Sequence, residues 1–235
     1  MNKIGYRYLG LFLSLNIAFQ LVSDATAGKL VTLAGYGVPV SILYFPVTYL
    51  LGDIITEVYG YAQARTVLWY TLFASVLAGL LYQFAIYVPP APFFKNNEAY
   101  AIVFGAVPRM LVAGWLATFA GETSNNFILA KMKVLTQGKY LWTRTIGSTI
   151  VGQAVGTTVF FLVGFTGSIP ADRFLKGLCA AWIIKTTIET IMTPVTYLVV
   201  GFLKRKEGVD YFDVGTNFSP FIIGAIQLEQ SLEQK

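Results

Sequence analysis

Six apolar stretches, each about as long as a membrane is thick, constrain this chain more than any other feature of its sequence. A helix that crosses a bilayer needs about 20 mostly apolar residues. The stretches of this length are Tyr8–Ala27, Val38–Tyr59, Thr66–Tyr87, Ala101–Ala130, Thr145–Phe165 and Leu178–Leu203. A helix also satisfies its own backbone hydrogen bonds in lipid. The sequence therefore predicts an all-α membrane protein with six transmembrane helices.

The composition agrees with a membrane location and excludes several kinds of chemistry. Hydrophobic residues make up 55% of the chain and charged residues 12%, which is about half the charged fraction of a soluble domain. The chain has no histidine, and its single cysteine, Cys179, excludes an intrachain disulfide. Histidine catalysis and histidine metal ligands are excluded as well. We therefore expect no cofactor and no bound metal.

The basic residues predict the orientation, because cytoplasmic loops carry an excess of lysine and arginine. With the N-terminus in the cytoplasm, 11 of the 17 basic residues fall inside, four outside and two within helices. We therefore expect a protein of the inner (cytoplasmic) membrane with both termini in the cytoplasm. Residues 1–206 should form the transmembrane domain, and residues 207–235 a cytoplasmic tail. The first stretch also resembles a signal peptide, but Asn16 and Gln20, one turn apart, favour a retained helix.

Two carboxylates lie inside the second stretch, in the segment FPVTYLLGDIITEVYGYAQAR at residues 45–65. Asp53 and Glu57 are four residues apart, so on a helix they share one face, and Tyr49 lies one turn earlier. A carboxylate at mid-bilayer costs roughly 2.5–3.5 kcal/mol on insertion scales, so it is kept where it faces a cavity, a cation or a substrate. The alternative is that both acids lie at a helix end and reach the membrane interface.

Four more ionisable residues fall well within the predicted helices: Arg109, Glu122, Lys185 and Glu189. Arg109 lies about 20 Å from Glu122 along a helix and on the opposite face, so it needs a partner on another helix or at an interface. Lys185 and Glu189 are one turn apart. They either neutralise each other or serve a function, and the sequence leaves both readings open.

Side-chain amides accompany these acids. Asn125 and Asn126 follow Glu122 on the fourth predicted helix, and Gln153 lies on the fifth. Carboxylates accept hydrogen bonds from ring and exocyclic N–H groups, whereas amides both donate and accept. Such a group of side chains suits a planar, nitrogen-rich heterocycle. The residues alone therefore predict a carrier that holds a small polar solute in a membrane cavity.

Several segments resemble the bacterial queuosine-precursor transporter family. They are the segment at 45–65, GETSNNFILAKMKVLTQGKYLWTRTIGSTIVGQ at 121–153, KTTIETIMTPVTYLVV at 185–200 and DYFDVGTNFSPF at 210–221. The resemblance implies six membrane helices. It also implies uptake of 7-deazaguanine bases, such as 7-cyano-7-deazaguanine and its aminomethyl relative, which feed the modified tRNA nucleoside queuosine.

The resembling segments supply the candidate substrate-binding residues, to which the charge argument adds Arg109: Asp53, Glu57, Arg109, Glu122, Asn125, Asn126, Gln153, Lys185 and Glu189. We favour Glu122 or Glu189 for the base, because one carboxylate can accept from its amide N–H and amino group together. The implied partners are this small molecule and the lipid bilayer, without nucleic acid. Homo-oligomerisation is left open.

The fifth predicted helix carries a ridge of small residues, Ser148, Gly152 and Gly156, which would let another helix approach closely. The family pattern often has an acidic residue shortly after the glycine of this helix. Gly156 stands there in this chain. The small-residue ridge predicts helix packing, and a moving contact during transport is the alternative.

Two other functions compete with a self-sufficient carrier. One is the substrate-binding subunit of an ATP-driven vitamin-type uptake system, since such subunits also have six helices. The first helix here lacks the Ala-x-x-x-Ala contact spacing common in those subunits, which favours the carrier. The other is an intramembrane enzyme, which is disfavoured because the chain has no histidine and no Gly-x-Ser-x-Gly nucleophile motif.

Overall fold

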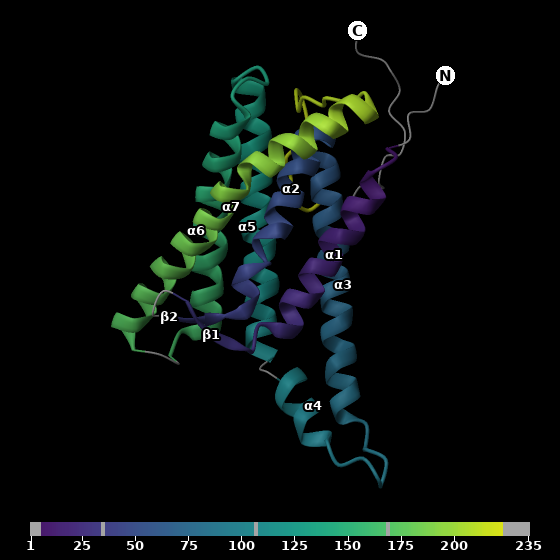
Figure 1. The fold of residues 1–235 in the computed structure, drawn as a ribbon, viewed down its shortest axis with the longest axis vertical. Helices are drawn as coiled ribbons and strands as arrows, with labels where there is room; N and C mark the ends of the chain where they lie inside the picture. The colour runs from purple at the N-terminus through teal and green to yellow at the C-terminus, as the bar shows by residue number, and fades with distance from the viewer. Residues whose placement is uncertain (1–5, 34–35, 106–107, 168–169, 223–235) are drawn as a thin grey trace.

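The computed structural model describes residues 6–33, 36–105, 108–167 and 170–222 of the chain. Within these residues, six helices are long and apolar enough to cross a membrane, which confirms the predicted number. They are α1 (Leu9–Thr26), α2 (Pro46–Tyr59, together with the 3-10 helix that leads into it from Val40), α3 (Tyr61–Tyr87), α5 (Pro108–Leu135), α6 (Leu141–Phe165) and α7 (Ala171–Glu207). Helix α1 begins and helix α7 ends at the same end of the bundle, at the top of Figure 1.

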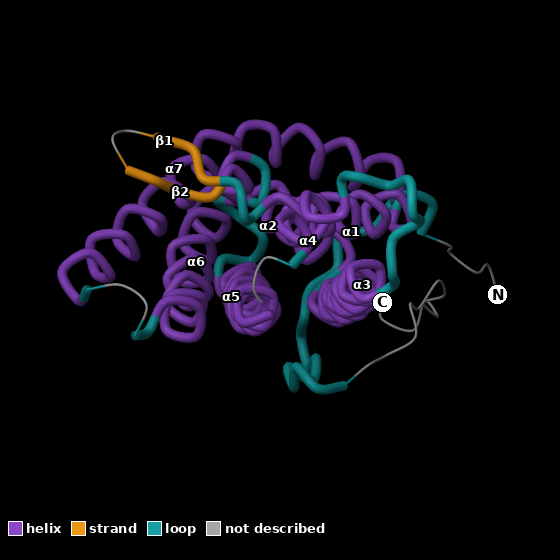
Figure 2. The backbone as a smooth tube through the Cα atoms, turned by 90° about the horizontal axis from the view of Figure 1, so that it is seen from below, coloured by secondary structure: helices purple, strands orange, loops and turns teal. Residues whose placement is uncertain are grey.

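Helix α2 lies in the middle of the bundle. It contacts α1, α3, α5 and α7, and Figure 2 shows it between α7 and the row formed by α3, α5 and α6. Every residue from Thr48 to Tyr59 is buried. The helix begins at Pro46, whose missing N–H is not needed in a first turn, and it ends at Gly60. The polar side chains of α2 therefore face other helices rather than lipid.

The connections around α2 differ from the sequence prediction. A two-stranded antiparallel hairpin, β1 (Leu30–Leu33) and β2 (Tyr36–Pro39), follows α1, and a 3-10 helix, η1 (Val40–Leu43), leads into α2. Sequence analysis placed these residues in a loop and in the second helix, because four-residue strands are too short to show a clear alternation. The prediction of an all-α fold thus holds for the elements of membrane-spanning length and misses this hairpin.

Several helix boundaries also differ from prediction, and two of the differences lie at glycines. Gly60 alone forms the turn between α2 and α3, so α3 begins at Tyr61 instead of Thr66. The predicted helix at 101–130 is divided into a short helix, α4 (Asn97–Phe104), and α5. Gly105 follows α4, and α5 begins at Pro108, a residue suited to the first position of a helix.

Helices α5 and α6 pack closely through the predicted small-residue ridge. A Cβ built on Gly152 would lie 2.6 Å from the Cβ of Asn125, and one on Gly156 would lie 3.1 Å from the carbonyl oxygen of Ala117. A Cβ on Gly121 would collide with the hydroxyl of Tyr49. Glycine at these positions therefore lets α5, α6 and the Tyr49 side chain of α2 meet.

The segment after α7 packs across the ends of α2 and α3. The N–H of Tyr211 donates to the carbonyl of Val58, and the buried Asp213 carboxylate accepts from the N–H of Tyr61 at 3.0 and 3.2 Å. Arg65 donates to the carbonyls of Asn217 and Ser219 at 2.9 and 2.7 Å. Residues 208–222 are thereby held against the bundle.

Candidate functional site

Three acids from three helices meet in the interior of the bundle. Asp53 of α2, Glu122 of α5 and Glu189 of α7 are 5%, 3% and 7% exposed. The charge of Asp53 acts on those of Glu122 and Glu189, and all three act on the hydroxyl of Tyr49. We call Tyr49, Asp53, Glu122 and Glu189, with the amides of Asn125 and Gln153, the central cluster.

The amides of the central cluster orient its acids. The side-chain NH2 of Asn125 donates to Oδ1 of Asp53 at 2.5 Å, which joins α5 to α2. The side-chain NH2 of Gln153 donates to Oε1 of Glu189, which joins α6 to α7. Asn126 does not bond to these acids; its Oδ1 accepts a hydrogen bond from the hydroxyl of Thr56 on α2 at 3.1 Å. Each of the two bonded acids thus keeps one oxygen away from its amide.

Buried acceptor oxygens remain without a partner in this cluster. Among the described residues, nothing donates to Oε1 of Glu122, Oδ1 of Asn125 or Oε2 of Glu189. Unpaired buried acceptors are rare in proteins, and each costs roughly 1–3 kcal/mol. Carboxylates and amide oxygens that lack donors bind N–H groups or cations well. The cluster can therefore accept hydrogen bonds from a donor-rich molecule.

Lys185 contributes a cation beside the cluster but does not pair with Glu189. Its ammonium lies 4.7 Å from the centre of the Phe45 ring, and its charge acts on Glu189 from a distance. Within the described parts of the chain, Lys185 has no ion pair closer than 4.0 Å. Of the two readings left open by the sequence, direct neutralisation of Glu189 by Lys185 is therefore not what the structure shows.

A narrow cavity opens beside Asp53 and Glu189. Its volume is about 10 Å³, and threonines supply much of its lining: Thr145, Thr149, Thr190, Thr193 and Thr196. Ligand pockets usually measure roughly 300–1,000 Å³, so this cavity admits about one water molecule. Pro194 follows Thr193 and has no N–H for the carbonyl of Thr190, which weakens α7 beside the cavity.

A larger groove lies between α6 and α7 on the outside of the bundle. It measures about 640 Å³ and is bounded by Trp142, Pro194, Tyr197 and Leu198 together with Thr190 and Thr193. The last two residues also line the narrow cavity. The cavity and the groove therefore share this stretch of α7 as part of their walls.

Glu57 lies in a second polar group, one turn further along α2. Its carboxylate is fully buried, and it accepts from Arg144 Nε and Nη2 at 2.8 Å each and from Lys204 Nζ at 2.6 Å. Lys133 Nζ lies 3.6 Å from the same carboxylate and 2.6 Å from Oδ1 of Asp210. We call Glu57, Lys133, Arg144, Lys204 and Asp210 the Glu57 ion network.

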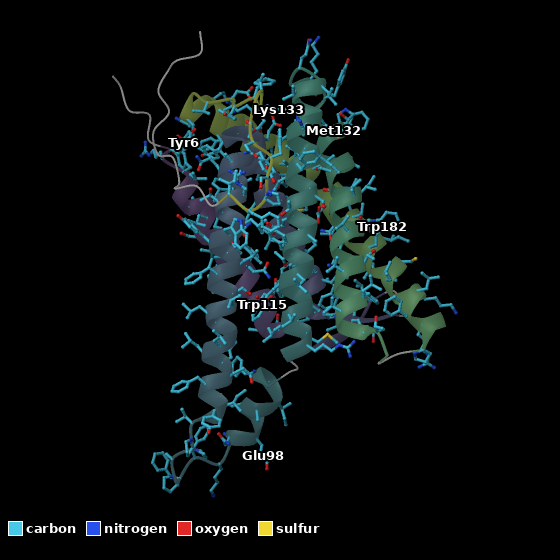
Figure 3. The ribbon with its side chains drawn as sticks, turned by 180° about the vertical axis from the view of Figure 1, so that it is seen from behind. Tyr6, Glu98, Trp115, Met132, Lys133 and Trp182 are labelled. Carbon is cyan, nitrogen blue, oxygen red and sulfur yellow. The ribbon has the colours of Figure 1, made fainter. Side chains whose placement is uncertain are left out.

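Sequence analysis placed Asp53 and Glu57 in one site, yet three cations occupy the surroundings of Glu57. Lys133 and Arg144 are two of the 11 basic residues assigned to the cytoplasmic side in the orientation argument, and each is 1% exposed in the structure. Figure 3 shows Lys133 on α5 near the end of the bundle where Tyr6 lies, well away from Trp115. A buried carboxylate such as Glu57 needs a cation nearby, and this requirement could have indicated from the sequence that some of the basic residues are its partners.

Asp210 anchors the segment after α7 to this network. Its Oδ1 also lies 2.9 Å from Lys204 Nζ. Burial favours the neutral carboxyl, but the hydrogen bonds from Lys133 and Lys204 outweigh this effect and hold the pKa of Asp210 below its ordinary value. Asp210 is thus ionised at neutral pH and shares both lysines with Glu57.

The structure does not bring Arg109 to the central cluster. Its guanidinium donates to the carbonyls of Val163 and Thr166 at 2.7 and 2.6 Å, at the end of α6. Val163 is ten residues from Gln153, or about 15 Å along the helix. Arg109 therefore satisfies carbonyls that the last turn of α6 leaves unpaired, and its side chain is exposed.

Comparison with known proteins agrees with this architecture. Residues 39–199 match the family described as "Putative vitamin uptake transporter". The chain is also similar to a protein of Bacillus subtilis (strain 168) named "Probable queuosine precursor transporter", with 26% identity over 204 residues, which cover 86% of this chain and 89% of the relative. No solved structure matches. The resemblance found in the sequence is thereby confirmed, and the chain belongs to this family of membrane uptake transporters.

Proposed function

We propose that the protein imports a 7-deazaguanine queuosine precursor across the bacterial cytoplasmic membrane. The observation that carries this proposal is the set of unpartnered acceptors in the central cluster, on Glu122, Asn125 and Glu189. A 7-deazaguanine offers a ring N–H and an amino group on one edge, and one carboxylate can accept both. The similarity to the Bacillus subtilis protein supports the same class of substrate.

In this proposal Glu122 or Glu189 accepts from the guanine-like edge, and Asn125 and Gln153 contact the rest of the base. Asp53 holds Asn125 in place through their 2.5 Å hydrogen bond. Glu57 and Arg109 are left out of the substrate contacts, because the ion network and the end of α6 already use their side chains. Lys185 stays beside the cluster as a source of positive charge.

Binding requires the helices to move. A base cannot enter a cavity of about 10 Å³, so the conformation described here is closed around the cluster. The cavity wall formed by Thr190 and Thr193 belongs to the part of α7 weakened by Pro194. We infer that movement of this part of α7 away from α6 opens the cluster.

The orientation with both termini in the cytoplasm also belongs to this proposal. Arg7, Lys139, Arg205 and Lys206 belong to the end of the bundle at which α1 begins and α7 ends. Lys133 and Arg144 lie at this end as well, but their pairing with Glu57 makes them weaker evidence for topology. The Glu57 ion network would then lie on the cytoplasmic side of the central cluster.

Uptake of labelled 7-cyano-7-deazaguanine by cells that cannot make it tests the proposal. The intact chain should restore uptake, whereas Glu122→Gln and Glu189→Gln should each reduce it at least about tenfold, since hydrogen bonds to charged groups contribute about 1.5–3 kcal/mol. Glu98→Gln, which removes an exposed carboxylate on α4, is the matched control and should behave as the intact chain. Equal uptake by all three variants at equal membrane abundance would refute the site.

Reconstitution separates the carrier from the alternative of a binding subunit. The purified chain in liposomes should accumulate or equilibrate the labelled base without any ATP-hydrolysing protein. Uptake that appears only after such a protein is added would assign the chain to an ATP-driven system.

A further inference from the structure

A second group of polar side chains lies where α1, α3 and α5 meet, and it shares no residue with the central cluster or the Glu57 ion network. Its members are Gln20, Ser23 and Asp24 of α1, Ser75 of α3 and Trp115 of α5, which we call the Asp24 group. We propose that it binds a monovalent alkali cation at Asp24, with Gln20 and Ser23 as further oxygen ligands. This site is separate from the proposed function, so either can fail without the other.

Both oxygens of the Asp24 carboxylate accept hydrogen bonds. Gln20 Nε2 donates to Oδ1 at 2.9 Å, and the hydroxyl of Ser75 donates to Oδ2. Trp115, which Figure 3 shows between α3 and α5, sets the direction of the second bond. Its indole N–H can only donate, and it donates to Ser75 Oγ at 2.7 Å, so the Ser75 proton is left for Asp24. A carboxyl group that accepts at both oxygens is in its ionised form.

The Asp24 charge has no counterion in the described part of the chain. No lysine or arginine nitrogen there lies within 4.0 Å of its carboxylate. Asp24 lies in the last turn of α1, which carries no basic residue. The C-terminal end of a helix adds a partial negative charge of about half an elementary charge. Two negative contributions therefore meet at this turn, and a bound cation would offset both.

Two more oxygens beside Asp24 lack a donor. Among the described residues, nothing bonds to Oε1 of Gln20 or to Oγ of Ser23, and these side chains are 1% and 2% exposed. Gln20, Ser23 and Asp24 are three and four residues apart, so they share one face of α1. Because the Gln20 amide bonds to Asp24 at 2.9 Å, its Oε1 lies within about 5.5 Å of the carboxylate.

These oxygens distinguish a cation from a proton. A proton on Asp24 would neutralise the charge but leave Gln20 Oε1 unpaired, whereas a metal cation binds carboxylate, amide and hydroxyl oxygens together. Hard cations prefer such oxygen ligands. One carboxylate balances one positive charge, so a monovalent cation leaves the site neutral and a divalent cation would not.

Asn16 connects the Asp24 group to α2. It lies one turn before Gln20, is 1% exposed, and donates from Nδ2 to the carbonyl of Thr48 at 3.2 Å. Thr48 precedes Tyr49 of the central cluster. The polar face of α1 that would hold the cation therefore also packs on α2, and occupancy of the site should stabilise the folded bundle.

Thermal unfolding of the purified chain in detergent tests the site. Replacing choline chloride with sodium or potassium chloride at constant ionic strength should raise the unfolding midpoint, by about 4–7 °C once the cation reaches about 20 times its Kd. Asp24→Asn should abolish this shift, whereas Glu98→Gln, which removes an exposed carboxylate, should keep it. Equal midpoints of the intact chain in all three salts would overturn the proposal, as would a shift that Asp24→Asn retains.

Ser23→Ala supplies a second test that does not touch the charge. The Ser23 hydroxyl bonds to no described residue, so its removal should leave the midpoint in choline chloride within about 2 °C of the intact chain. The cation concentration that gives half of the shift should rise by about two- to tenfold, the value of one lost oxygen contact. An unchanged half-shift concentration would overturn the ligand set.

Discussion

Removing the negative charge of Glu57 should strongly destabilise the protein. The substitution Glu57→Gln takes away the carboxylate that accepts two hydrogen bonds from Arg144 and one from Lys204. Asp210 still serves Lys204, and the carbonyls of Lys139 and Gly138 still accept from Arg144, but the Arg144 charge loses its counterion. Breaking one member of a buried ion pair costs about 3–5 kcal/mol in the free energy of unfolding.

Thermal unfolding of the purified protein in detergent measures this effect. For a chain of this size, about 3–5 kcal/mol corresponds to a decrease of roughly 6–20 °C in the unfolding midpoint. Glu98→Gln, the same change at an exposed position, should stay within about 0.5 kcal/mol of the intact protein. In a double-mutant cycle, Glu57→Gln should cost clearly less when Arg144→Gln is already present. Additive costs, or a midpoint equal to that of Glu98→Gln, would refute the role given to the ion network.

Three further substitutions test other parts of the structure. Gly60→Ala should lower the free energy of unfolding by about 1–3 kcal/mol, because φ at this position is +87° and the new Cβ would lie 2.2 Å from the Tyr211 ring. The segment after α7 should then be cleaved faster by a protease. Unchanged cleavage would contradict the packing of Tyr211 on Gly60. Gly156→Asp should lower the free energy of unfolding by about 1–3 kcal/mol through overpacking, since even a Cβ at this position would lie 3.0 Å from the Tyr49 hydroxyl. The measurement is the thermal unfolding midpoint, which should fall. Asp210→Asn should destabilise the protein at pH 7. Because the folded pKa of Asp210 is lowered, its contribution is fully present above its unfolded pKa of about 3.9 and is lost as pH falls through its folded pKa, so the two unfolding midpoints should meet only below that folded pKa.

The number of long helices and the acids inside them followed from local properties of the sequence. Runs of about 20 apolar residues predict helices wherever they occur, and a carboxylate inside such a run is conspicuous at any position. Asp53, Glu122 and Glu189 were found in this way, and all three are buried. The hairpin at 30–39 was missed because two four-residue strands carry too little pattern to compete with the apolar run beside them.

Partnership between helices was beyond sequence reasoning. Spacing predicts that residues four apart share a face, which put Glu57 with Asp53 and Lys185 with Glu189. In the folded chain Glu57 instead meets Arg144 from 87 residues away, and Lys185 lies over the Phe45 ring. These contacts depend on how α2, α6 and α7 are placed, and no property of a single helix specifies that placement.

The sequence by itself determined that this chain forms six membrane-length helices, that several contain charges lipid does not tolerate, and that it lacks the residues for histidine or disulfide chemistry. Only the tertiary structure decided which acids stand together without a counterion and which acid three cations neutralise. The physical reason is the distance along the chain over which each property acts. Hydropathy and helical periodicity act over a few turns of one segment, whereas the charge balance of a buried site is a sum over side chains from four helices distant in the chain.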